Sequence, residues 1–278
     1  MSKETVGKNA LVYQHLLAGI TRFGGTPENI CRLAFKCEPE LISERVILAP
    51  MWDSDIFAPW AESITPQTEG IIRKVDELVL EGKKVTFIRT GPGSPAVAHA
   101  VFALSCTPCK NIIFIGTAGG MVENQQVGDI LIPEYSVAGD GASRYITKKK
   151  VKDNDCFGLK YYPHPEIFER INAAARKVCE EYKIGWHKTR TFSVDNIFAE
   201  FAHLEEIINL GCDSIEMETA LLFRTAEVCD IKAGAVFFVS DNSIGGKSIY
   251  GNDFREEREK RDFIRNEIIT RIVIDSLP

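Results

Sequence analysis

The chain has 278 residues, of which 45% are hydrophobic and 26% charged, a composition typical of a folded domain with a substantial core. Its formal net charge of −6 excludes the basic field that neutralises many phosphates, so we expect no nucleic-acid partner. The apolar runs, such as residues 112–115 and 235–239, are far shorter than the roughly 20 residues that cross a bilayer. The polar start "MSKETVGKNA" has no signal-peptide core, so we expect no membrane partner and a cytoplasmic location.

The predicted elements alternate between apolar β-branched runs and longer helical patterns. We predict strands over residues 46–49, 85–89, 111–115, 129–133, 189–194 and 233–240. We predict helices over residues 8–18, 94–105, 165–182, 201–210, 217–229 and 254–275. Residues 71–80 have apolar side chains at helical spacing, but the following "EGKK" indicates a hairpin turn, so we favour a strand for their C-terminal part. This order predicts one α/β domain with a largely parallel or mixed sheet.

Eight cysteines are too few and too irregularly spaced for a disulfide framework, and several lie in apolar contexts. Cys106 and Cys109 form one CxxC, but it ends a helical stretch and precedes a strand, the reverse of a thioredoxin-like arrangement. No second CxxC and no HxxxH accompany it. We therefore expect no metal and no cofactor.

Two predicted strands end in glycine-rich loops, "FIRTGPGSPAVAHA" and "IFIGTAGGM". Glycine allows sharp turns and close approach of a ligand to backbone amides, so Gly91 and Thr117 are candidates for an anion or polar-ligand site. A dinucleotide site is disfavoured because Ala96 occupies the third glycine position and no acidic residue follows at the expected distance. Simple strand-to-helix turns remain an alternative.

Acidic residues lie at two strand ends. Glu216 and Glu218 flank Met217 at a strand-to-helix junction, where they either cap the helix or bind hydroxyls of a sugar. Asp241 follows the fully apolar stretch 233–239, where burial would raise its pKa and allow general acid catalysis; the alternative is an Asp that caps the next loop.

Three segments in this order, "GTAGGMVENQQVGDILIP", "SIEMETALLF" and "FFVSDN", resemble the nucleoside phosphorylase superfamily, which includes purine nucleoside phosphorylases, uridine phosphorylases and the methylthioadenosine and AMP nucleosidases. The resemblance implies a single-domain, three-layer α/β sandwich around a mixed sheet. Residues 45–278 would form the catalytic domain and residues 1–44 a helical extension packed on it. The resemblance also implies cleavage of a nucleoside N-glycosidic bond.

Carried over by position, the resemblance assigns roles to individual residues. Glu216, Met217 and Glu218 would contact the ribose. Asp241 would protonate or hydrogen-bond the purine N7, with Ser240 beside it. The base would stack near Ile197 and Phe198, where the family usually has an aromatic residue. The aspartate favours a purine over a pyrimidine. The glutamine and arginine that uridine phosphorylases place in this region are absent from "FAEFAHLEE".

The acceptor side departs from the phosphorylase pattern. The chain has "LAPMWDSD" where those enzymes have G-D-P-x-R, and Phe114 to Thr117 where they have R-x-G-S/T, so both phosphate-binding arginines are missing. Arg89, Arg45 or a neighbouring subunit could substitute. The nucleosidases also lack these arginines, and "APMWDSD" aligns with their acidic segment so that Asp53 would activate water.

We therefore expect an enzyme that cleaves purine nucleosides or nucleotides, with water modestly favoured over phosphate as the acceptor. The runner-up is a purine nucleoside phosphorylase with unfamiliar phosphate ligands, in which phosphate is a co-substrate. A protein that binds nucleosides without cleaving them is a third hypothesis. The family's habit of completing sites across subunits implies a homo-oligomer.

Overall fold

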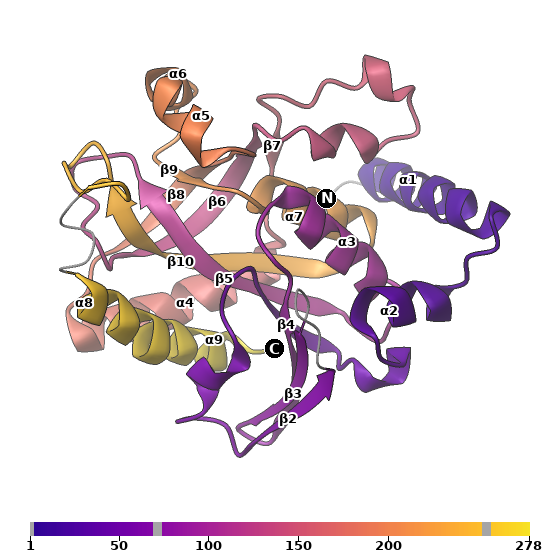
Figure 1. Ribbon diagram of the computed structural model, residues 1–278, viewed down its shortest axis with the longest axis horizontal. Coiled ribbons are helices and arrows are strands. Elements are labelled where there is room, and N and C mark those ends of the chain that lie inside the picture. The colour runs from indigo at the N-terminus through magenta and orange to yellow at the C-terminus, as the bar shows by residue number, and fades with distance from the viewer. Residues whose placement is uncertain (1–2, 69–73, 252–256) are drawn as a thin grey trace.

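The computed structural model describes residues 3–68, 74–251 and 257–278, and a curved mixed β-sheet forms its centre (Figure 1). The strand order is β10-β6-β8-β9-β5-β1-β4-β3-β2, with β7 beside β6. The strands are β1 (Arg45–Ala49), β2 (Ser63–Thr68), β3 (Lys74–Leu80), β4 (Lys83–Arg89), β5 (Asn111–Gly120), β6 (Ile130–Ala138), β7 (Lys160–Tyr161), β8 (Trp186–Ser193), β9 (Ser214–Glu216) and β10 (Lys232–Asn242). The helices are α1 (Lys3–Arg22), α2 (Pro27–Phe35), α3 (Ser94–Leu104), α4 (Pro165–Tyr182), α5 (Ile197–Ala202), α6 (Leu204–Asn209), α7 (Thr219–Val228), α8 (Arg258–Phe263) and α9 (Thr270–Ser276).

Parallel pairing dominates the middle of the sheet. β1 lies parallel to β4 and β5, and β5 lies parallel to β10. β2, β3 and β4 form an antiparallel edge. β10 also pairs with β6, and β9 pairs with both β5 and β8, so β5, β10, β6, β8 and β9 form a closed ring of strands. The predicted α/β fold with a mixed central sheet is confirmed.

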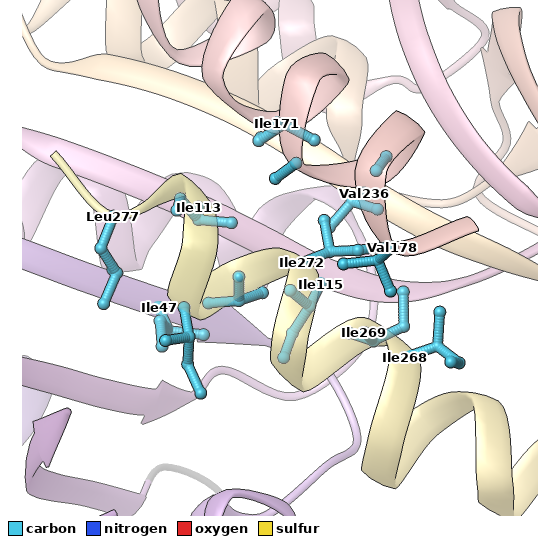
Figure 2. Packing of buried hydrophobic residues seen from close by; sticks show 14 of the residues in the cluster. Ile47, Ile113, Ile115, Ile171, Val178, Val236, Ile268, Ile269, Ile272 and Leu277 are labelled. Atoms are coloured by element: carbon cyan, nitrogen blue, oxygen red, sulfur yellow. The ribbon is translucent and has the colours of Figure 1, made fainter. Parts of the chain in front are cut away.

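Helices cover both faces of this sheet. Along β1, Ile47 packs against α4 and α9, whereas its neighbours Val46 and Leu48 pack on the opposite side against α2, α3 and α7, as the two-residue period of a strand requires. Figure 2 shows Ile47, Ile113, Ile115 and Val236 of the sheet meeting isoleucines of the C-terminal helix. The result is three layers.

The chain departs from the predicted elements in several places. β2 and α2 were not predicted; β2 is a polar edge strand with little apolar alternation, so its sequence signal is weak. The helix predicted over residues 201–210 is two short helices, α5 and α6, that meet at His203. In the stretch predicted as one helix over residues 254–275, residues 254–256 lie outside the described part, and residues 264–269 form a π-helical segment between α8 and α9. The strand favoured within residues 71–80 is present from Lys74, and residues 71–73 lie outside the described part.

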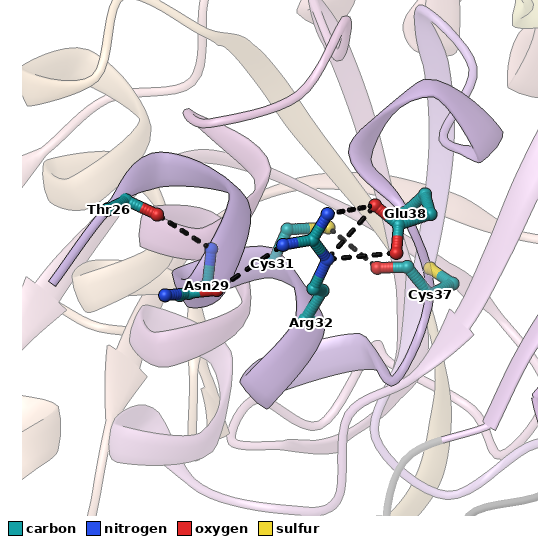
Figure 3. Close-up of polar contacts among 6 residues, drawn as sticks. All are labelled: Thr26, Asn29, Cys31, Arg32, Cys37 and Glu38. Carbon is teal, nitrogen blue, oxygen red and sulfur yellow. Dashed lines mark hydrogen bonds and ion pairs between the residues drawn. The ribbon is translucent and has the colours of Figure 1, made fainter.

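The N-terminal helices pack on the sheet's α3 and α7 side. Thr26 caps α2 by accepting a hydrogen bond from the Asn29 backbone N–H at 3.3 Å, and Arg32 pairs with Glu38 at 2.7 Å where the chain turns towards β1 (Figure 3). The buried Cys31 donates to the Cys37 carbonyl at 3.5 Å. The division of the chain at residue 44 stays a prediction.

Candidate active site

A cavity of about 550 Å³ lies where β1, β4, β5 and β10 reach their carboxyl ends, the edge at which open α/β sheets bind ligands. β9, α5 and the segment after β10 complete its wall. Its lining residues are Pro50, Met51, Trp52, Pro92, Gly116, Thr117, Ala118, Gly119, Ile197, Glu200, Ile215, Glu216, Met217, Glu218, Ser240, Asp241 and Ile249. The structure thus brings together in one cavity the two acidic segments and the second glycine loop that the sequence singled out.

Glu216 is the most rigidly held carboxylate of the cavity. Its Oε2 accepts hydrogen bonds from the backbone N–H groups of Glu218 at 2.7 Å and Thr219 at 2.8 Å, and its Oε1 accepts one from the Ser193 hydroxyl. The two backbone donors, Glu218 and Thr219, lie at the start of α7, so Glu216 caps that helix and also faces the cavity. Burial raises the pKa of Glu216, and the three hydrogen bonds oppose that rise.

Glu218 links the acidic segment to the first glycine loop. Its Oε1 accepts a hydrogen bond from the Gly93 N–H at 2.6 Å, and the Ser94 hydroxyl donates to the Met217 carbonyl at 2.7 Å. Gly93 has a φ of 94°, which side chains other than glycine's rarely allow, so the close approach depends on glycine. Burial, and then the charge of Glu216, raises the pKa of Glu218 to about 8. The Gly93 N–H of the first glycine-rich loop therefore faces Glu218 and is not open to an anion.

Asp241 lines the cavity as the penultimate residue of β10. Its Oδ1 accepts a hydrogen bond from the Ser240 hydroxyl at 2.7 Å. Burial raises the pKa of Asp241, while the Ser240 hydrogen bond and the nearby Arg261 guanidinium oppose the rise. A carboxyl whose pKa is raised by burial holds its proton to a higher pH than an exposed aspartate does, and it can give that proton to a ligand atom.

Glu200 is a lining residue that the sequence did not single out. It lies on α5 one helical turn after Ile197, so both side chains reach the cavity from the same face of the helix. Asn196 caps this helix by accepting from the Ala199 N–H at 3.1 Å. Burial, and then the charge of Asp241, raises the pKa of Glu200 to about 7. The three-residue spacing from Ile197 is the signal that would have identified it.

The acceptor side of the cavity is apolar except for one hydroxyl. Pro50, Met51, Trp52 and Pro92 surround Thr117, whose side chain is exposed to the cavity. The Trp52 indole stacks on Phe238 with ring centroids 5.8 Å apart and an angle of 12°. Among the residues that the structure describes, no lysine, arginine or histidine lines this cavity. Its charged groups are carboxyls alone.

Some predicted site residues lie outside the cavity wall. Asp53 lines a neighbouring cleft, where it pairs with Arg89 at 3.0 Å and with Lys74 at 3.9 Å. Phe198 is 81% exposed and packs its ring against Tyr250, facing away from the lining that its neighbour Ile197 joins.

Two further residues considered for the acceptor side are not among the lining residues, although Gly91 directly precedes the lining residue Pro92. Gly91 supports the turn after β4 with a φ of 81° and is not part of the cavity wall. Arg45 donates to the Pro278 carbonyl at 2.6 Å, at the opposite end of β1 from the cavity. The role of Gly91 in an acceptor site stays a prediction.

The CxxC lies at the end of α3. Burial raises the pKa of both Cys106 and Cys109, which disfavours the thiolate that redox chemistry requires. Within residues 3–68, 74–251 and 257–278, no group of His, Cys, Asp and Glu side chains is arranged to hold a metal ion. In the same described ranges, no helix combines the length and the apolar character needed to cross a membrane.

These features define an α/β protein with an acidic ligand cavity at the carboxyl edge of its central strands. The family model described as the phosphorylase superfamily matches residues 64–272. Because the match covers more than half of the chain, the chain belongs to the phosphorylase superfamily, whose members include phosphorylases and nucleosidases, and the resemblance inferred from the sequence is confirmed.

Relatives and solved structures agree with this assignment. The chain is 28% identical over 171 residues to a DeoD-type purine nucleoside phosphorylase of Exiguobacterium sibiricum, covering 60% of this chain and 67% of the relative. Its fold is similar to uridine phosphorylase from Vibrio fischeri, with a TM-score of 0.69, 18% identity and coverage of 85% and 92% of the two chains. It is also similar to a methylthioadenosine/S-adenosyl homocysteine nucleosidase of Campylobacter jejuni, with a TM-score of 0.65, 14% identity and coverage of 84% and 98%.

Proposed function

We propose that this protein cleaves the N-glycosidic bond of purine nucleosides. The observation that carries the proposal is that Asp241, Glu216 and Glu218 line one cavity and that burial raises the pKa of each of these carboxyls. The relatives named as purine nucleoside phosphorylases support the choice of a purine.

In the proposed reaction, Asp241 faces N7 of the purine and the sugar lies over Met217. As the bond between C1′ and N9 breaks, its electron pair moves into the base, and Asp241 transfers its proton to N7. Positive charge develops on the sugar next to Glu218. A neighbouring cation lowers the pKa of a carboxyl, so Glu218 ionises more readily as the transition state forms and stabilises it most there.

Water is our favoured acceptor for the sugar. A phosphate dianion beside Thr117 would find no lysine, arginine or histidine of the described residues in the cavity wall to offset its charge. Asp53 lies in a neighbouring cleft, where it pairs with Arg89 and Lys74, so we assign the activation of that water to no residue. Attack of water on C1′ would release ribose and a proton.

A phosphorylase that takes its phosphate ligands from a second copy of the chain is the second candidate. Two observations favour it: the relatives are named phosphorylases, and the acceptor side is open enough for Met51 to remain 67% exposed. In that case the protein is a homo-oligomer whose sites are completed between subunits, which light scattering would reveal.

The test is to incubate the protein with inosine, adenosine, AMP and methylthioadenosine, with and without phosphate, and to identify the sugar product. We expect free base and ribose without phosphate. Strict phosphate dependence with ribose 1-phosphate as product would establish the second candidate. Tight binding of nucleosides with no cleavage under either condition would instead identify a nucleoside-binding protein.

A further inference from the structure

Two carboxyls from different elements meet at the base-facing end of the cavity. Asp241 reaches it from β10 and Glu200 from α5, with Ile197 and Ile249 as apolar neighbours in the lining. Both side chains line the same cavity, and the negative charge of Asp241 contributes to the raised pKa of Glu200. The proposed reaction uses Asp241 and leaves Glu200 without a role. Glu200 is half-buried in a ligand cavity, where a carboxyl is favoured when it remains neutral or finds a donor on the ligand.

We propose that Glu200 selects the purine by its 6-substituent, and that the selection changes with the protonation of Glu200. The proposal rests on the proposed function only in placing purine N7 against Asp241. N7 and the 6-substituent share one edge of the purine ring. N7 lies between C8 and the 6-substituent, and the proposal places Glu200 on the side of the 6-substituent.

The two forms of Glu200 favour different purines. An ionised carboxylate only accepts hydrogen bonds, so it binds a 6-amino group and repels a 6-oxo oxygen. A neutral carboxyl has one O–H donor, so it can donate to the 6-oxo oxygen while its carbonyl can still accept from an amino group. Loss of the proton therefore penalises 6-oxopurines and leaves 6-aminopurines well bound.

The surroundings of Glu200 bring this change near neutral pH. The titratable groups that share its cavity are Asp241 on β10, Glu216 on β9 and Glu218 at the start of α7. The nearby cation, Arg261 of α8, acts on Asp241. Burial and the charge of Asp241 raise the pKa of Glu200 to about 7, so its charge changes between pH 6 and 8.

The experiment measures the affinity of adenine and hypoxanthine for the protein by calorimetry at pH 6 and pH 8. For the wild type we expect the affinity ratio of adenine to hypoxanthine to rise about tenfold from pH 6 to pH 8, the size of one hydrogen bond to a charged group. For Glu200→Gln, which always offers a donor and an acceptor, we expect a ratio that changes less than about twofold. Glu205→Gln, an exposed substitution on α6, should behave as the wild type.

Three results would overturn the proposal: a wild-type ratio that does not change with pH, a Glu200→Gln ratio that still changes as the wild type does, or no binding of either base. If Glu200→Gln does not fold, as judged by circular dichroism, the wild-type ratio alone decides. Binding of free bases requires no turnover. A protein that cleaves no nucleoside would refute the proposed function and still leave this test in force.

Discussion

Replacement of Asp241 by asparagine tests the chemistry most directly. The two side chains have the same shape, and the amide oxygen can still accept the hydrogen bond that the Ser240 hydroxyl gives Asp241 at 2.7 Å. The change removes only the transferable proton. Asp241 is buried, and it accepts hydrogen bonds from the Ser240 hydroxyl and the Ile249 backbone N–H, neither of which is acidic enough to replace a carboxyl as the proton donor.

The expected loss follows from the role of a general acid. A general acid contributes about 10²- to 10⁴-fold to the rate, so kcat for inosine or adenosine should fall by about that factor. The loss corresponds to about 3–5 kcal/mol of transition-state stabilisation, and KM should change much less. Product formation is followed by chromatography of the released base. p-Nitrophenyl riboside serves as the matched substrate, because its phenolate leaves without a proton.

The two substrates together decide the interpretation. A proton-donating Asp241 predicts that Asp241→Asn cleaves p-nitrophenyl riboside within about threefold of the wild-type rate while losing purine cleavage. Equal losses with both substrates would refute the general-acid role and indicate that Asp241 shapes the cavity. An unchanged rate with purines would refute it outright.

Three further predictions follow from the same geometry. Glu218→Gln should lower kcat/KM by about ten- to a hundredfold, the worth of one interaction with a charged group, as steady-state kinetics would show; an unaltered value would exclude Glu218 from transition-state stabilisation. Asp53→Asn should leave kcat within about twofold, because Asp53 pairs with Arg89 outside the cavity wall; a hundredfold loss would instead support water activation by Asp53. The ligand-free protein should be less stable at pH 8.5 than at pH 5.5, because the folded pKa values of Glu200 and Glu218 are raised above their unfolded ones. The stability that these carboxyls contribute is fully present below about pH 4.5 and is lost as the pH rises through about 7 and 8. Urea titrations at the two pH values that show the same free energy of unfolding would contradict this.

The strands that lie buried in the middle of the sheet were predicted correctly from the sequence, because burial fixes the pattern of their apolar residues. The strands β1, β4, β5 and β10 are apolar on both faces, because helices cover the sheet on each side, and such runs are easily recognised. β2 escaped prediction because it is a polar edge strand, paired on one side only with β3. The break between α5 and α6 at His203 escaped it because neither glycine nor proline marks that position.

The candidate site was predictable in part for a similar reason. Glu216, Glu218 and Asp241 stand out because acidic residues are rare at the ends of apolar strands. Glu200 lies in a stretch that contains several other acidic residues, so only its helical spacing from Ile197 distinguishes it. Asp53 follows β1 at the expected place in the chain, but the ion pair that neutralises it involves Arg89 of β4, and one sequence does not reveal that contact.

The hydrogen bond from the Gly93 N–H to Glu218 also bears on how the protein folds. It joins residues 125 positions apart in the chain, so the sugar-facing wall cannot form by local contacts. Contacts of such long sequence separation form late and slowly, because a large loop must close first. A newly synthesised chain therefore acquires its ligand site only after the whole stretch between these residues has folded, and ligand binding should protect late-forming structure against hydrogen exchange.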